Sequence, residues 1–412
     1  MVFSDSQQSI DATFKFLLIS RSARSISLIF VTLAFSLYLH ILGFGLVFIG
    51  LVYLPIVVFN MLLSLVLGIL GDRIGYSRAL IIGDILPVFG LAGLSLSTNI
   101  AIVAVSAVAT GITGTAGGAR GAFSPGLTAF IASNWPDEVS RVNMLARMSV
   151  VASLSAIVGS FLLLTHGYLT PYFGSVGTFH VLFVASFFVM LISLVSLLFL
   201  KERRRPRKTS RVMKRESFSY LLRVMLPNIM NGSAIGIALP LLPLWFELRY
   251  SISVSTVGEI FTLAYAATAA GSYLSGKYLN SARISAIRVS SVTRFFQGGI
   301  LVAIALIPFL PAAFILYAAR SAVAGAGIPM RGAISIRGIG DEDYGTASSL
   351  QGVATRGSQT TSGLSGYLMD ASFQSPLIVG GIIQIGSSIV YYRAIRNWEK
   401  RRESSAGESQ ES

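Results

Sequence analysis

The sequence has no cysteine, only three histidines (His40, His166 and His180) and little charge. Asp, Glu, Lys and Arg make up 12% of its 412 residues, whereas soluble domains carry roughly 25%. The absence of cysteine excludes disulfides and thiolate chemistry, and so few histidines exclude most zinc sites. We therefore expect no metal site and no other cofactor. The low charge argues against a water-soluble chain.

Apolar residues take the place of the missing charge. They make up 53% of the sequence and gather into runs of the length, roughly 20 residues, that crosses a bilayer as a helix. The centres of twelve such runs lie near Val31, Val58, Val88, Val108, Leu154, Phe188, Ile235, Leu263, Val302, Val323, Thr360 and Ile385. We therefore predict an all-α, polytopic membrane protein with twelve transmembrane helices.

The ends of the first spans can be placed from the pattern. The apolar stretch from Ile26 to Leu70 is too long for one helix, and the segment from His40 to Gly45 is the expected turn within it. We interpret the run that begins near Ile26 as a retained first span, because a second apolar run follows at once. The eleventh span is so rich in Ser, Thr and Gln that hydropathy alone would miss it.

Lys and Arg outnumber Asp and Glu, and the formal net charge is +14. The even-numbered connections between spans carry Arg73, Arg78, Arg141, Lys277, Arg283, Arg288 and Arg337. The odd-numbered connections carry Arg249 alone. Since basic residues are retained on the cytoplasmic side, we expect the even connections and both termini to be cytoplasmic, in the plasma membrane.

The densest basic segment joins the sixth and seventh spans. From Lys201 to Arg223 it holds ten Lys and Arg residues against Glu202 and Glu216. Such a run is also found in nucleic-acid-binding proteins. Between two spans it is better interpreted as a cytoplasmic linker that contacts anionic lipid headgroups. We therefore expect the lipid bilayer as a partner and no nucleic acid.

This linker separates two similar halves. At an offset of 204 residues, Leu70 corresponds to Leu274 and Gly159 to Gly363. The repeat predicts two pseudo-symmetric six-helix bundles, one over residues 1–200 and one over residues 224–398. The linker then covers residues 201–223, and we expect a disordered cytoplasmic tail over residues 399–412.

A polar segment of eleven residues, GILGDRIGYSR, lies between the second and third spans and begins at Gly68. It resembles the signature loop of the major facilitator superfamily, G-x-L-x-D-R-x-G-x-x-R, and the resemblance covers almost the whole chain. The matching residues, which we interpret as a gating motif, are Gly68, Asp72, Arg73, Gly75 and Arg78. Gly68 allows close helix approach and Gly75 allows a turn that a Cβ would obstruct. Asp72 can accept hydrogen bonds from the N–H groups that open the next helix.

The resemblance implies a secondary transporter and not an enzyme. It implies two bundles that rock about a central cavity and bind a small-molecule solute near the bilayer midplane. We expect a monomer that carries a small anionic solute. The alternatives are a multidrug efflux proton antiporter and a transport-dead receptor or scaffold. Exporters of this family carry a G-P-x-x-G-G run in the fifth span, whereas the segment from Val150 to Leu164 has one glycine and no proline.

Two arginines inside predicted spans are the first candidates for substrate binding, because a charge at the bilayer centre costs about 2.5–3.5 kcal/mol on insertion scales. Arg320 and Arg356 each lie about nine residues inside a span, from opposite sides, so they reach a similar depth. Tyr317 and Gln359, each three residues away, share their helix faces. We expect this group to bind an anion. The alternative is a structural role, with bonds to backbone carbonyls or to Glu259.

The seventh predicted span adds two polar candidates. Asn228 and Asn231 share one helix face and precede Pro240 and Pro243. This pattern indicates a polar helix that can kink and line the cavity.

Asp84 in the third span and His40 in the first are the candidates for a coupling proton. Burial of a carboxyl group raises its pKa toward values that are useful for proton transfer. The alternative for Asp84 is a structural ion pair with Arg120 or Arg147. For His40 the alternative is capping of the outer end of its helix.

Overall fold

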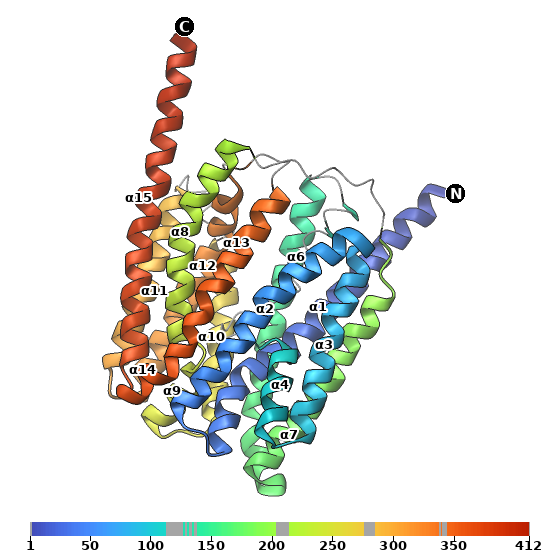
Figure 1. The fold of residues 1–412 in the computed structure, drawn as a ribbon, viewed down its shortest axis with the longest axis vertical. Helices are drawn as coiled ribbons and strands as arrows, with labels where there is room; N and C mark the ends of the chain where they lie inside the picture. The colour runs from blue at the N-terminus through green and yellow to red at the C-terminus, as the bar shows by residue number, and fades with distance from the viewer. Residues whose placement is uncertain are drawn as a thin grey trace.

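The computed structural model of the chain describes residues 2–112, 127, 130–131, 134–135, 138–202, 214–275, 285–337, 339 and 344–411. The elements in these ranges are helices (Figure 1). In chain order they are α1 (Val2–Ile41), α2 (Leu46–Ile74), α3 (Tyr76–Leu96), α4 (Ile100–Thr110), α6 (Glu138–Leu164), α7 (His166–Leu198), α8 (Arg215–Ala238), α9 (Leu242–Tyr250), α10 (Val254–Leu274), α11 (Ala286–Leu306), α12 (Leu310–Arg337), α13 (Tyr344–Ser358), the 3-10 turn η3 (Gln359–Ser362), α14 (Gly363–Ala371) and α15 (Ser375–Glu411).

Among the described residues, nine helices are long and apolar enough to cross a membrane. Each of the twelve predicted span centres lies in a described helix or in η3. The helices α4, α10 and the broken segment α13–η3–α14 are not among the nine, so the number of twelve spans stays a prediction. The expected turn between the first two spans is confirmed, because α1 ends at Ile41 and α2 begins at Leu46.

Two helix ends differ from the sequence prediction. The first candidate span begins at Ala12, well before Ile26, and it includes Arg21 and Arg24. The two arginines interrupt the apolar run, so hydropathy alone places the start too late. At the other end, α15 continues to Glu411 through the segment expected to be disordered. That segment contains several Glu, Lys, Arg and Gln residues, all of which favour helix.

The helices pack mainly with neighbours on their own side of the linker. In the N-terminal bundle, which comprises α1 to α7, α1 contacts α6 and α7, and α3 contacts α4 and α7. In the C-terminal bundle, which comprises α8 to α15, α11 contacts α12 and α15, and α15 also contacts α8. The division into two halves at the linker stays a prediction that this packing supports.

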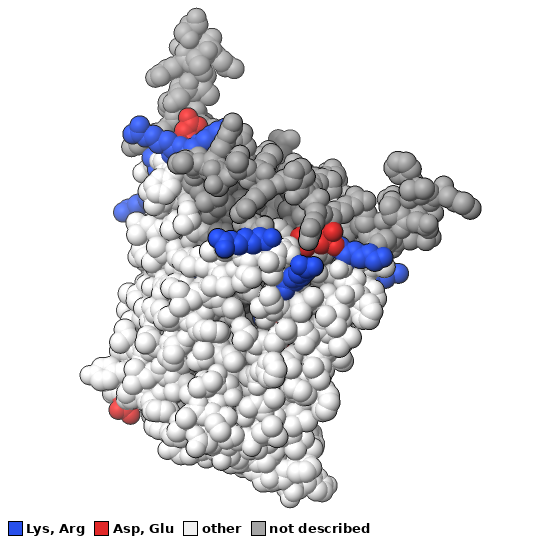
Figure 2. Space-filling view, turned by 45° about the vertical axis from the view of Figure 1, so that its right-hand side comes forward, with Lys and Arg blue, Asp and Glu red and all other residues white. Residues whose placement is uncertain are grey.

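Both chain ends lie at the same end of the molecule, which we call the terminal end (Figure 1). On the face shown in Figure 2, Lys and Arg gather toward this end, and most of the remaining surface is uncharged. An even number of membrane crossings would place both termini on one side in this way. Which side is cytoplasmic stays a prediction.

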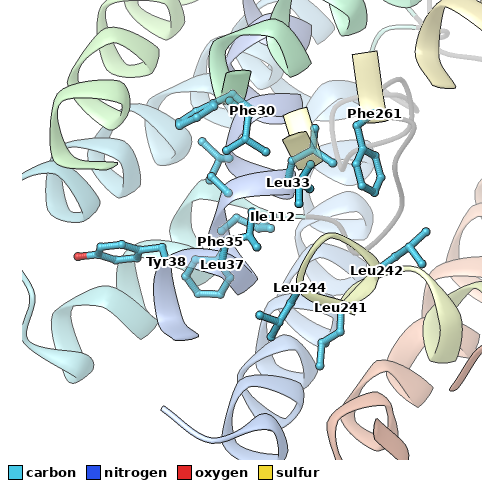
Figure 3. Close-up of a cluster of buried hydrophobic side chains, with 14 of the residues drawn as sticks. Phe30, Leu33, Phe35, Leu37, Tyr38, Ile112, Leu241, Leu242, Leu244 and Phe261 are labelled. Carbon is cyan, nitrogen blue, oxygen red and sulfur yellow. The ribbon is translucent and has the colours of Figure 1, made fainter. Parts of the chain in front are cut away.

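The largest buried apolar cluster joins the two bundles away from the terminal end. Phe35 and Leu37 of α1 are fully buried and belong to the same cluster as Leu242 and Leu244 of α9 (Figure 3). Phe261 of α10 lies in this cluster too. In lipid such packing stabilises through close van der Waals contact and not through removal of apolar surface from water. The cluster therefore holds the two bundles together at one end.

Candidate functional site

The described helices of the two bundles meet in three places. α2 contacts α13, η3 and α14, α10 contacts α6 and α7, and α1 contacts α9. Figure 1 shows α2 and the α13–η3–α14 segment side by side along the middle of the molecule. In an alternating-access transporter these contacts are the ones that must change as the bundles rock.

Glycines allow the backbones of α2 and α14 to touch. A Cβ built on Gly50 would lie 2.6 Å from the backbone N of Gly366, and a Cβ on Gly366 would overlap the carbonyl O of Leu46. Small residues at a helix interface permit this close approach in membranes. Leu46 begins α2 at the end of the molecule opposite the termini. The contact therefore closes the bundle interface at that end.

The contact between α6 and α10 closes the same end. A Cβ built on Gly258, near the start of α10, would lie 2.5 Å from the backbone N of Leu164, which ends α6. Next to it, the N–H of Gly167 donates a hydrogen bond of 2.7 Å to Oγ of Ser255. Both bundles are thus joined by backbone-level contacts opposite the terminal end.

The gating motif forms the junction of α2 and α3. Gly75 separates the two helices with φ of +103°, a conformation that side chains with a Cβ rarely adopt. The N–H groups of Tyr76 and Ser77 donate hydrogen bonds of 3.0 and 2.9 Å to the two carboxylate oxygens of Glu202. The partner of these two N–H groups is Glu202, which lies four residues after the end of α7, at the start of the linker. The expectation that Asp72 accepts hydrogen bonds at the start of α3 stays a prediction.

Other members of the motif are peripheral to this junction. Arg73 and Arg78 are exposed, as expected of cations at a membrane surface. The side chain of Asp72 lies outside the described residues. The expected close helix approach at Gly68 is not seen among the described residues, because a Cβ built there would meet none of their atoms within 4 Å. Gly71 is the tight position instead, since its Cβ would overlap the ring of Tyr76.

Asp84 is fully buried on α3 and forms an ion pair with Arg24 of α1. Ser193 of α7 donates a hydrogen bond of 2.5 Å to its second oxygen. An ion pair is what the structural alternative predicts, and its described partner is Arg24. Arg147 is exposed on α6, and Arg120 lies outside the described residues. A role of Asp84 in proton coupling stays a prediction.

The sequence reading missed the cations beside Asp84. Arg21 is also buried and lies within electrostatic reach of both Arg24 and Asp84. The two arginines are three residues apart and therefore share one face of α1. That spacing, just before an apolar run, is the signal that would have identified them.

Arg320 lies inside the C-terminal bundle. It is 5% exposed on α12, and its Nε has no hydrogen-bond partner among the described residues. The preceding turn carries Tyr317, whose ring lies 5.2 Å from that of Phe261 and 5.6 Å from that of Phe246. Glu259, the alternative acidic partner, is exposed on α10. Arg320 and Tyr317 thus share a buried, largely aromatic setting.

Arg356 and Gln359 lie in a different setting. Both are half-buried, in the segment α13–η3 that contacts α8 on one side and α2 of the other bundle. No contact between Arg356 and Arg320 is found among the described interactions. The two arginines have the same predicted depth, whereas the packing places Arg356 at the bundle interface and Arg320 behind it.

The two asparagines of α8 bind polar groups from α11 and α15. Oδ1 of Asn228 accepts a hydrogen bond of 2.5 Å from Arg294, whose guanidinium lies 4.2 Å above the ring of Tyr391. Oδ1 of Asn231 accepts a bond of 3.1 Å from Gln384. The predicted polar face of this helix therefore exists, and part of it is directed into the C-terminal bundle.

His40 is half-buried in the last turn of α1, and its Nδ1 has no hydrogen-bond partner among the described residues. A basic group near a helix C-terminus interacts favourably with the helix dipole. This position fits the capping alternative, and protonation for coupling stays a prediction. In the described part of the chain, no three His, Asp or Glu side chains gather to hold a metal.

The model of the Major Facilitator Superfamily matches residues 16–228 of the chain. The match covers more than half of the sequence, and the chain belongs to this superfamily of secondary transporters. The resemblance of the segment that begins at Gly68 is thereby confirmed. No curated protein matches the chain.

Solved structures of transporters share the fold. A bacterial homologue of the human lysosomal transporter Spinster, inward-facing and unoccupied, has a TM-score of 0.70 at 13% identity and covers 95% of this chain and 98% of its own. The human organic anion transporter MFSD10 (TETRAN) has a TM-score of 0.65 at 14% identity, with 94% and 99% covered. A proton-dependent oligopeptide transporter has a TM-score of 0.71 at 12% identity, with 94% and 99% covered. At these identities the likeness shows the fold alone.

Proposed function

We propose that this secondary transporter carries a small anionic solute across the plasma membrane by alternating access, with both termini in the cytoplasm. The observation that carries the proposal is the charge of the buried residues. Among the described residues, four arginines are buried (Arg21, Arg24, Arg294 and Arg320), whereas Asp84 is the one buried carboxylate. An interior with this excess of positive charge attracts an anion and repels a cation. The structurally similar MFSD10 is an organic anion transporter, which is consistent with the proposal.

The arrangement of the bundle contacts supports an inward-facing state. The glycine contacts of α2 with α14 and of α6 with α10 close the end opposite the termini. One of the similar structures is inward-facing and unoccupied. In this state the solute would leave or enter at the terminal end, and the outer contacts would open in the opposite half of the cycle.

Arg356 is the proposed first contact for the anion. It lies at the bundle interface on α13, and Gln359 follows on the same side one turn later. Arg320 with Tyr317, and Asn228 with Asn231, would supply a second layer of polar groups behind it. An arginine suits this role because its planar guanidinium can bind a carboxylate or phosphate through two hydrogen bonds.

Proton coupling is part of the proposal. Asp84 and His40 are its candidates, and proton-dependent oligopeptide transporters share the fold. A proton on the Asp84 carboxylate would weaken its ion pair with Arg24. Protonation would therefore change the contacts between α1 and α3. Such a change offers a path from proton binding to helix movement.

Transport in proteoliposomes tests the proposal. Purified protein would be reconstituted with an imposed pH gradient and offered labelled carboxylates, phosphates, neutral sugars and lipophilic cations. We expect gradient-dependent accumulation of an anion. Transport of lipophilic cations alone would favour the multidrug antiporter, and no transport of any class would favour the receptor or scaffold.

A further inference from the structure

A groove of about 670 Å³ lies between α11 and α15, outside the interface of the two bundles. Its walls include the first turns of α11 and the stretch of α15 that approaches the terminal end. Three arginines line it: Arg288 on α11, and Arg393 and Arg396 on α15. None of the described residues that line it is acidic. The groove therefore has a strongly basic wall, and no acidic group of the described part of the chain balances it.

The three guanidinium groups are available to a ligand. All three side chains are exposed, and none forms an ion pair with a described carboxylate. Arg393 and Arg396 are three residues apart, so they share one face of α15. Arg396 donates a hydrogen bond of 2.8 Å to the hydroxyl of Tyr392, which orients its guanidinium at the groove. Together they can surround one phosphate group.

The deeper part of the groove is apolar. Val292 and Phe295 follow Arg288 by four and seven residues on α11, and Ile389 precedes Arg393 by four on α15. At 1.5 Å per residue these side chains lie about 6–10 Å farther into the bilayer than the arginines. Each of the three is 45% exposed, so an acyl chain can reach it.

The arginines lie at the depth of lipid headgroups. The candidate span of α15 ends at Trp398, whose ring packs 4.5 Å from that of Tyr220. Trp and Tyr mark the interface between hydrocarbon and headgroups. Arg393 and Arg396 lie in the last two turns before Trp398, and Arg288 lies in the first turn of α11.

We propose that this groove binds one anionic phospholipid from the leaflet at the terminal end. The three arginines would hold its phosphate, and an acyl chain would lie along Val292, Phe295 and Ile389. Basic pockets between transmembrane helices bind anionic headgroups in this way. The site is separate from the solute path, so it would stabilise the C-terminal bundle and does not depend on which solute is carried.

Native mass spectrometry of the full-length protein tests this site. The protein would be purified with an equimolar mixture of phosphatidylglycerol and phosphatidylcholine, and the lipids retained would be counted. We expect wild type to keep one phosphatidylglycerol in preference to phosphatidylcholine. In the triple variant R288Q/R393Q/R396Q the preference should fall by about fivefold for each arginine removed. The single variants R288Q and R393Q keep the test valid if the triple variant does not fold.

A matched control removes two exposed cations of the N-terminal bundle, outside both the groove and the linker, in the variant K15Q/R147Q. This control should retain the lipid as wild type does. Equal loss in the control, or no loss in the groove variants, would overturn the proposal. Inorganic phosphate should not displace the lipid at millimolar concentration, and I389A/F295A should weaken lipid retention. Displacement by phosphate, or full retention in I389A/F295A, would assign the groove to a free anion and also overturn it.

Discussion

Glu202 and Gly75 meet where α2 ends and α3 begins. The Glu202 carboxylate accepts hydrogen bonds from the N–H groups of Tyr76 and Ser77, and a Cβ on Gly75 would lie 2.9 Å from its Oε2. The start of the linker is therefore tied to the gating motif. A negative charge at this place also interacts favourably with the N-terminus of α3.

Gly75→Ala should destabilise the protein by about 1–3 kcal/mol, because alanine at positive φ is strained and its Cβ would displace Glu202. The measurement is the thermal unfolding temperature in detergent, together with transport rate. Gly68→Ala is the matched control in the same motif. It adds a Cβ in open space within a helix, so it should be neutral or stabilise by up to about 1 kcal/mol. Equal effects of the two variants would contradict the prediction.

Glu202→Gln should weaken the cap of α3 by about 0.5–2 kcal/mol, since an amide oxygen accepts fewer and weaker hydrogen bonds than a carboxylate. We expect slower transport with little change in expression, because the junction of α2 and α3 lies within the gating motif. Glu216→Gln removes an exposed acid from the first turn of α8 and serves as the control. Wild-type transport in Glu202→Gln would show that the contact is not part of gating.

Asp84→Asn should destabilise the fold by about 3–5 kcal/mol, because it leaves Arg24 buried without its counter-ion. The double variant R24M/D84L removes both charges and should recover most of this loss. The free energies of unfolding of the single and double variants measure how strongly Arg24 and Asp84 stabilise each other. Uptake driven by a pH gradient then separates the two roles of Asp84. If the double variant still accumulates solute against its gradient, Asp84 is structural and is not the proton carrier.

Arg356→Ala should weaken anion binding by about 10-fold to 100-fold, the range expected for one charge-assisted hydrogen-bonded contact. Arg356→Lys should lose less, because lysine keeps the charge and lacks the planar fork. Equilibrium binding of candidate anions to the purified variants measures both losses of affinity. Arg223→Ala changes a half-buried arginine of α8 and is the control. Anion affinity equal to wild type in Arg356→Ala would return the multidrug antiporter to first place.

Cysteine labelling suits this chain, which has no cysteine of its own. In intact cells, Ser210→Cys and Ser404→Cys should be protected from an impermeant thiol reagent, because we expect the linker and the C-terminus to be cytoplasmic. Thr98→Cys, at an exposed position between α3 and α4, should react. The reverse pattern of labelling would invert the proposed orientation.

Sequence alone determined the properties that depend on runs of neighbouring residues. Apolar runs indicated membrane helices, the segment from His40 to Gly45 indicated the first turn, and the residues from Gly68 to Arg78 indicated the superfamily. Each of these signals is local, because a span must satisfy its own backbone hydrogen bonds within the bilayer. A local signal can be recognised without knowing what packs against it.

Only the tertiary structure decided which polar groups meet. Arg24 and Asp84 are 60 residues apart, Glu202 and Tyr76 are 126 apart, and Arg294 and Asn228 are 66 apart. The burial of each charge is determined by helices from elsewhere in the chain, so no local pattern predicts its partner. For the same reason Arg320 and Arg356, equal in predicted depth, differ in their surroundings. A hydropathy profile gives depth along one helix, whereas the partner of a buried charge depends on the rotation and packing of its neighbours.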